Sequence, residues 1–153
     1  MNTNILTDAR LALVARLQTI TVANGYRTNA GQNVETGWLK EVIEKNSEGF
    51  PLICLQRAPG GDPVEGPGVI GLAPAFYVIG AVDAGLDDYD SALEDIELDL
   101  IRCLITGKGR PIDWMPRGTV SVSLSTSEHY PPGNGESSAS VMVPIQLAIN
   151  IRP

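Results

Sequence analysis

The carboxylates from Asp87 to Asp99 form the densest set of side chains in this 153-residue sequence that could do chemistry. No Lys or Arg interrupts them. Asp95 and Asp99 are four residues apart, so on a helix they would share one face and could bind a divalent metal ion. Such pairs are common on solvated helix faces, and we assign no metal ligand. The seven acids are Asp87, Asp88, Asp90, Glu94, Asp95, Glu97 and Asp99.

The simplest interpretation of this acidic stretch is a solvated face on a helix that begins there. Negative charge near a helix N-terminus is stabilising, by about 0.3–1 kcal/mol per group at exposed positions. Two sharper interpretations remain open: the face meets a basic patch on a partner, or it lines a channel that must not hold DNA. Composition does not separate the two.

The other reactive side chains are few and scattered. One histidine, His129, lies in a polar stretch, and a triad or a histidine-rich metal site cannot be built from it within one subunit. Cys54 and Cys103 lie in the apolar contexts ICLQ and IRCLI, which predict buried, reduced thiols. We therefore predict no catalytic residue, no cofactor and no metal, and we expect that the protein is not an enzyme.

One glycine motif matches the pattern of a dinucleotide-binding site. Gly66 to Gly71 fits G-x-G-x-x-G, but a dinucleotide site needs a strand before this motif and a helix that starts at it. Here a Gly- and Pro-rich stretch precedes the motif and a predicted strand follows it, so the match is a coincidence. The sequence contains no G-x-S-x-G, G-x-x-x-x-G-K-[ST], H-E-x-x-H or C-x-x-C motif.

Charge and hydropathy exclude two classes of partner. The 11 Lys and Arg against 18 Asp and Glu give a net charge of −7, which disfavours tight nucleic-acid binding, because that binding depends on clustered cations. No apolar run reaches the roughly 20 residues of a membrane span, and the N-terminus has no signal-peptide layout, so we expect no membrane association.

Hydrophobic periodicity predicts an α+β fold with a mainly antiparallel sheet in a single domain, 1–153. Apolar residues recur at helical spacing in 5–20 and in 89–104, and they predict two amphipathic helices packed on one face of the sheet. Ser91 and Glu94 match a capping box, and Gly107 is a natural C-terminal cap. Strands are predicted at 51–57 and 69–85, and 119–151 alternates as a long C-terminal hairpin in which Pro144 marks an edge or a bulge.

The segments between these elements are predicted with less structure. A small hairpin is expected around Asn29 to Gly31, and 38–49 fits either a short helix or an irregular strand. Two flexible loops are expected at 58–68, which holds four Gly and three Pro, and at 126–139. Because long loops are often functional, we expect them to contact other chains. The residues chosen as interaction candidates are Asp62, Glu65, His129, Tyr130 and Asn134.

The order of these elements, from a helix ending at NGY through PLICLQR to the final alternating hairpin, resembles the tail terminator (tail completion) proteins of long-tailed bacteriophages. The resemblance covers nearly the whole chain and lies in layout, without a shared motif. It implies a structural protein of the virion that forms a ring, commonly a hexamer, at the end of the tail tube. Its partners would be copies of itself, the tail tube protein and the head–tail connector protein.

The resemblance also implies location: the phage tail in the virion, and the cytoplasm of the bacterial host during assembly. A head–tail adaptor (neck) or baseplate subunit is the second hypothesis, since it would share the fold class. A metal-dependent enzyme that uses the acidic helix is the third.

Overall fold

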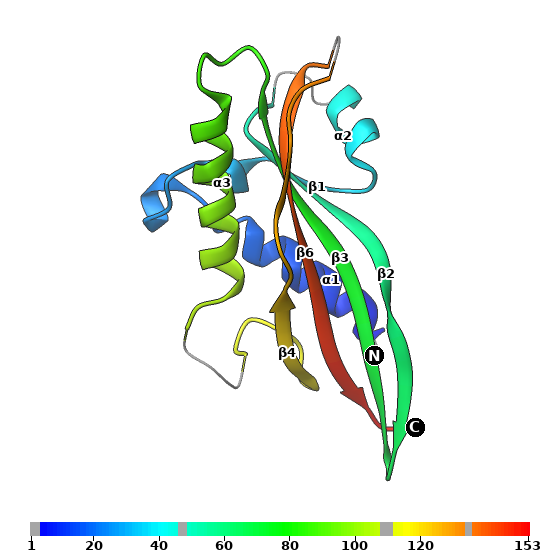
Figure 1. Ribbon diagram of the computed structural model, residues 1–153. Coiled ribbons are helices and arrows are strands. Elements are labelled where there is room, and N and C mark those ends of the chain that lie inside the picture. The colour runs from blue at the N-terminus through cyan, green and yellow to red at the C-terminus, as the bar shows by residue number, and fades with distance from the viewer. Residues whose placement is uncertain (1–3, 46–48, 108–111, 134–135) are drawn as a thin grey trace.

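The computed structural model describes residues 4–45, 49–107, 112–133 and 136–153, which form a mixed α+β fold around one six-stranded sheet (Figure 1). The elements along the chain are α1 (Ile5–Leu17), the 3₁₀ turns η1 (Val22–Asn24) and η2 (Ala30–Gln32), β1 (Val34–Thr36), α2 (Leu39–Lys45), β2 (Leu52–Gly66), β3 (Val69–Asp83), α3 (Tyr89–Leu104), β4 (Thr119–Leu124), β5 (Glu128–Tyr130) and β6 (Ser138–Ile151).

The sheet is mainly antiparallel, as predicted. Its strand order is β1-β2-β3-β6-β4, and β5 pairs with β6 beyond the end of β4. Among the strand pairs of the described residues, only the short pair β1–β2 is parallel. The longest ladder joins β3 to β6 and runs from Ile70 opposite Ile151 to Asp83 opposite Ser138. β4 lies antiparallel to β6, in agreement with the predicted C-terminal hairpin.

Both faces of the sheet carry a hydrophobic cluster. Ile53 and Leu55 belong to a large cluster that also contains buried residues of α1 and α3, whereas Leu52 and Cys54 belong to a smaller one with Val42 of α2. Since successive strand residues point to opposite faces, the two clusters lie on opposite sides of the sheet. Figure 1 shows α3 and α2 on these two sides. α2 therefore covers part of the second face, which is opposite to α1 and α3.

The N-terminal ends of the two long helices are set by side-chain caps. The Asn4 side chain accepts a hydrogen bond of 2.9 Å from the Leu6 amide at the start of α1. At α3 the cap is Asp88, whose carboxylate accepts bonds from the Ser91 amide (3.1 Å) and hydroxyl (2.7 Å). The predicted capping box that begins at Ser91 is thus wrong by one turn, because the aspartate three residues earlier occupies the cap.

The predicted loop 58–68 is wrong, because most of it belongs to a hairpin of two 15-residue strands, β2 and β3. The pairing tolerates its Gly and Pro residues through two register shifts, between Ala58 and Gly61 and between Gly61 and Val64. Gly60 allows close approach of the strands, since a Cβ there would lie 2.3 Å from the Ala73 carbonyl oxygen. The tip is a turn around Gly68, whose φ is +69°.

The predicted loop 126–139 also contains a strand. β5 pairs with β6, with His129 opposite Val141. Pro144 of β6 lies between the ends of β4 and β5, where its carbonyl accepts a 2.9 Å hydrogen bond from the Ser125 amide. The N–H and C=O of one residue in an antiparallel strand point to the same side. An N–H at Pro144 would therefore point to the side of β6 where pairing changes from β4 to β5 and the ladder is interrupted. Proline therefore sits inside a strand with neighbours on both sides.

The hairpin predicted around Asn29 to Gly31 is absent from the described chain. This segment forms η2 instead and packs against the end of α1, where the Gly31 amide donates a 2.8 Å bond to the Ile20 carbonyl. A Cβ on Gly31 would lie 2.6 Å from that oxygen, so the contact requires glycine. The chain then enters β1, which pairs with β2, and the ambiguous stretch after it forms the helix α2.

Candidate assembly surfaces

The acidic stretch of α3 is divided between structural and exposed carboxylates. Asp95 accepts a 2.7 Å bond from the Arg27 side chain, and Glu97 lies 2.5 Å from Nε2 of His129. Asp87, Asp90 and Glu94 are exposed and have no ion pair within the described residues. Nor does the described part of the chain contain a group of three or more His, Cys, Asp or Glu placed to hold a metal ion.

Asp99 corrects the prediction of a uniformly solvated face, because its side chain is fully buried. Its carboxylate accepts hydrogen bonds from the backbone amides of Arg27 and Thr28, at 2.8–3.1 Å, and from the Thr28 hydroxyl at 2.8 Å. A buried carboxylate needs such donors, since an unpaired one would be strongly destabilising. Asp99 thus fastens the segment after η1 to α3, and it would not be available to a ligand.

β5 lies against α3 through the pair between His129 and Glu97. On the opposite face of β5, the Tyr130 hydroxyl donates to the Glu128 carboxylate, and this bond raises the pKa of Tyr130. Tyr130 is 44% exposed. His129 is therefore held in place rather than free in a loop, whereas Tyr130 remains available for contact.

The predicted interaction residues fall into two groups at opposite ends of the sheet. Glu65 pairs with Ile70, which pairs with Ile151 at the end of β6, whereas His129 pairs with Val141. Ten residues of β6 separate these positions, or about 33 Å at the rise of a strand. Asp62 lies with Glu65 and Tyr130 lies with His129; Asn134 is outside the described residues. The two segments that the sequence analysis selected thus lie far apart on the sheet.

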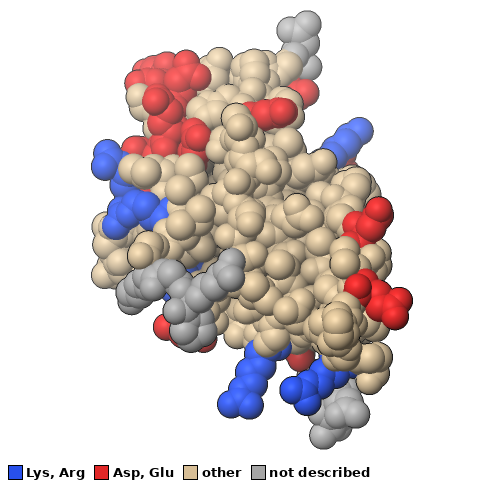
Figure 2. All heavy atoms as spheres, turned by 60° about the horizontal axis from the view of Figure 1, so that its bottom comes forward, with Lys and Arg blue, Asp and Glu red and all other residues tan. Residues whose placement is uncertain are grey.

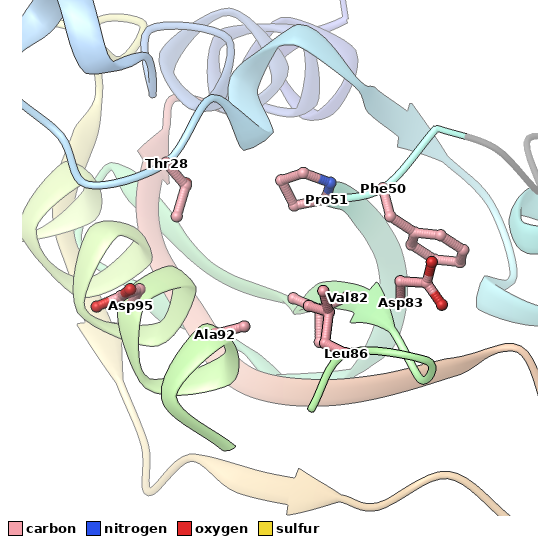
Figure 3. Close-up of a pocket in the computed structure, with 8 residues that line it drawn as sticks. All are labelled: Thr28, Phe50, Pro51, Val82, Asp83, Leu86, Ala92 and Asp95. Atoms are coloured by element: carbon pink, nitrogen blue, oxygen red, sulfur yellow. The ribbon is translucent and has the colours of Figure 1, made fainter. Parts of the chain in front are cut away.

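A pocket of about 530 Å³ opens between the start of α3, the end of β3 and the segments at Thr28 and Pro51 (Figure 3). Its polar groups are committed to the fold: the Thr28 hydroxyl bonds Asp99, Asp95 bonds Arg27, and Asp83 accepts from the Gly85 amide at 2.9 Å. The other five lining residues are apolar. Its lining residues are Thr28, Phe50, Pro51, Val82, Asp83, Leu86, Ala92 and Asp95.

Both cysteines are free and buried, as predicted. Burial raises the pKa of Cys54 to about 11, and burial also raises the pKa of Cys103. Their thiols donate weak bonds to the carbonyls of Gly37 and Arg16, each at 3.2 Å. Since the thiolate is the reactive form, these groups behave as packing residues.

Sequence reasoning missed a surface that includes Trp38, which is 63% exposed. A shallow pocket of about 160 Å³ lies beside it, between Arg10 of α1 and residues 55–57 of β2. Arg10 and Arg57 line this pocket, and the Arg57 guanidinium lies 4.7 Å from the centre of the Phe76 ring. These side chains are far apart in sequence. The one local signal of this surface in the sequence was Trp38, an aromatic residue directly before the start of a possible helix.

No family model matches the chain, and no curated protein matches it. Within the described residues, no helix has the length and apolar character needed to cross a membrane.

Proposed function

We propose that this protein is a structural protein of a bacteriophage virion that closes the tail tube as a ring. In this role it ends polymerisation of the tube and forms the joint to the head–tail connector. Its partners are copies of itself, the tail tube protein and the connector protein. The proposal combines the resemblance in layout with one structural observation, the exposed arm formed by β2 and β3.

The arm is the part of the β2–β3 hairpin from Arg57 to Ala73. Every residue from Pro59 to Glu65 is exposed, and Val64 is 65% exposed. In Figure 1 this hairpin continues past the helices to one end of the molecule. A 15-residue strand pair needs only part of its length to cover the core, and long exposed projections usually carry function. An arm of this kind is suited to contact with a neighbouring subunit.

A ring follows if the arm contacts a different surface on the next copy. Such head-to-tail contacts close into a ring when the rotation between copies is a simple fraction of a turn. One face of the ring would then match the docking surface of the tube, and the other would accept the connector instead of more tube. No step in this mechanism requires chemistry on a small molecule.

Light scattering on the purified protein, with electron microscopy of the same sample, tests the proposal. We expect discrete rings that bind the tail tube protein of the same phage. Val64→Asp should weaken ring formation while leaving the circular dichroism spectrum unchanged, because Val64 is exposed and far from the core. Glu44→Lys, an exposed change on α2, is the control and should form rings like the wild type.

A protein that stays monomeric both alone and with tube protein would overturn the proposal. Rings that bind portal or baseplate proteins and ignore the tube would favour the adaptor or baseplate hypothesis, since the arm serves either role. Calorimetric titration with Mg²⁺, Mn²⁺ and Zn²⁺ addresses the enzyme hypothesis, which requires a bound metal ion.

A further inference from the structure

The backbone around Trp38 is held firmly although its indole ring is exposed. The Gly37 amide donates a 3.2 Å bond to the Leu55 carbonyl of β2, and the Leu39 amide donates a 3.2 Å bond to the Gln56 side chain. The Trp38 carbonyl accepts the first helical bond of α2, from Val42, at 3.0 Å. A tryptophan presented on a fixed backbone loses little entropy on binding, which is the property of an interface anchor.

Two cations flank this ring without carboxylate partners. Arg10 of α1 and Arg57 of β2 line the 160 Å³ pocket beside Trp38, and neither forms an ion pair within the described residues. The Arg57 guanidinium stacks on Phe76, a contact that fixes its direction. Exposed Trp and Arg together are the residues most enriched at interface hot spots. The surface formed by Arg10, Trp38 and Arg57 is called the Trp38 pocket below.

The same chain carries a surface of opposite charge at the start of α3. Figure 2 shows acidic side chains gathered at one corner of the molecule, where α3 begins. Asp87, Asp90 and Glu94 are exposed there without an ion pair among the described residues, and Leu86 next to them is 46% exposed. The segment 86–94 thus combines carboxylates with one large exposed apolar side chain, that of Leu86. In the Trp38 pocket, the two arginines are the counterparts of the carboxylates and Trp38 is the counterpart of Leu86.

We propose that segment 86–94 of one copy docks into the Trp38 pocket of a second copy. Leu86 packs on the indole of Trp38, and the carboxylates of Asp90 and Glu94 pair with Arg10 and Arg57. The inference rests on the proposed self-assembly and adds a second contact between neighbouring copies to the contact made by the arm. Because the two surfaces differ, the contact is head-to-tail, and each copy offers one of each to its neighbours.

Charge complementarity selects this occupant over other parts of the chain. With a net charge of −7, two copies repel each other unless a contact places acids against unpaired cations. The Trp38 pocket provides two such cations at one site, and segment 86–94 provides the exposed carboxylates. Like-charge contacts between two acidic ends would be unfavourable, which fixes the orientation of the neighbours.

Charge reversal in pairs tests the contact. The pocket variant is Arg10→Glu with Arg57→Glu, and the helix variant is Asp90→Lys with Glu94→Lys. Light scattering over a concentration series should show each variant associating roughly 10- to 100-fold more weakly than the wild type, because two attractive pairs become repulsive. Trp38→Ala should weaken association at least about tenfold. Circular dichroism checks that each variant is folded.

Mixing the pocket variant with the helix variant is the decisive measurement. Each then offers the other a complementary surface, so the mixture should form rings of alternating copies. Arg117→Glu with Arg152→Glu is the matched control: both residues are exposed outside the pocket, and the net charge changes by the same amount as in the pocket variant. This control should associate like the wild type.

The inference fails if the mixture stays dissociated, or if the control variant is weakened as much as the pocket variant. In both cases the wild type still forms rings, so the proposed function stands and a different contact holds the copies together. A wild type that never associates, even with tube protein, overturns the proposed function and this contact together.

Discussion

Replacing Asp99 with alanine should destabilise the fold more than replacing any other carboxylate of α3. The substitution removes one buried acceptor from two backbone amides and one hydroxyl, those of Arg27 and Thr28. A buried donor left without a partner costs about 1–3 kcal/mol. Because Arg27 is exposed and Thr28 is partly exposed, water can reach these donors, and the lower bound applies to each. The expected loss is therefore about 3 kcal/mol.

Urea and thermal unfolding followed by circular dichroism at pH 7 measure this loss. For a chain of this length 1 kcal/mol corresponds to about 2–4 °C, so the midpoint should fall by about 6–12 °C. Asp99→Asn keeps one acceptor oxygen and should fall between alanine and the wild type. Asp95→Ala, four residues earlier on the same helix, breaks only an exposed pair and should have a much smaller effect.

The reasoning is refuted if Asp99→Ala and Asp95→Ala unfold at the same midpoint. That result would mean that the segment after η1 is held by its apolar contacts, with the carboxylate contributing nothing. An Asp99→Asn variant as stable as the wild type would show instead that the negative charge is irrelevant and one neutral acceptor suffices.

Three further outcomes can be checked. Gly80→Ala should lower the free energy of unfolding in urea by about 1–3 kcal/mol, because its Cβ would lie 2.8 Å from the Ile96 side chain. Gly71→Ala on the same strand, with contacts of 3.6 Å or more, should lower it much less. Equal losses would contradict the packing argument. Cys54, with its pKa raised by burial from 9.0 to about 11, keeps its proton in the folded state at a pH where the unfolded chain loses it, so stability should fall as pH rises above 9; Cys54→Ala should flatten that slope, and an unchanged slope would exclude the thiol as its cause. Raising NaCl from about 0.05 M to about 0.5 M should weaken association of the wild type through screening, and association that ignores salt would contradict a contact based on exposed charges.

The regular elements were predictable because their patterns are local. α1, α3 and the alternating strand β6 place apolar residues at periods that a core imposes, and these three elements lie where the sequence indicates. The hairpin arm was not predictable, because Gly and Pro in 58–68 disfavour a regular strand. Register shifts and an outer position on the sheet allow them, and neither property is written in local sequence.

The candidate surfaces show a similar division. Burial of Cys54 and Cys103 follows from their neighbours in sequence, and that prediction is confirmed. The role of Asp99 is different: its donors lie about 70 residues away, so its burial depends on tertiary contacts that no spacing rule reveals. The Trp38 pocket likewise unites α1, β2 and the start of α2. Whether Asp62, Glu65, His129 and Tyr130 contact other chains stays a prediction.

Two prolines of the arm, Pro59 and Pro63, lie within β2 and have a consequence for solubility. β1 pairs with β2 only as far as Leu55, so the outer side of β2 beyond that point has no neighbouring strand within the described residues. An unpaired strand edge can pair with the edge of another sheet, and such pairing can repeat without limit. Proline discourages this pairing because it cannot donate a backbone N–H. Pro59 and Pro63 therefore oppose the growth of copies of this chain into fibres through this edge.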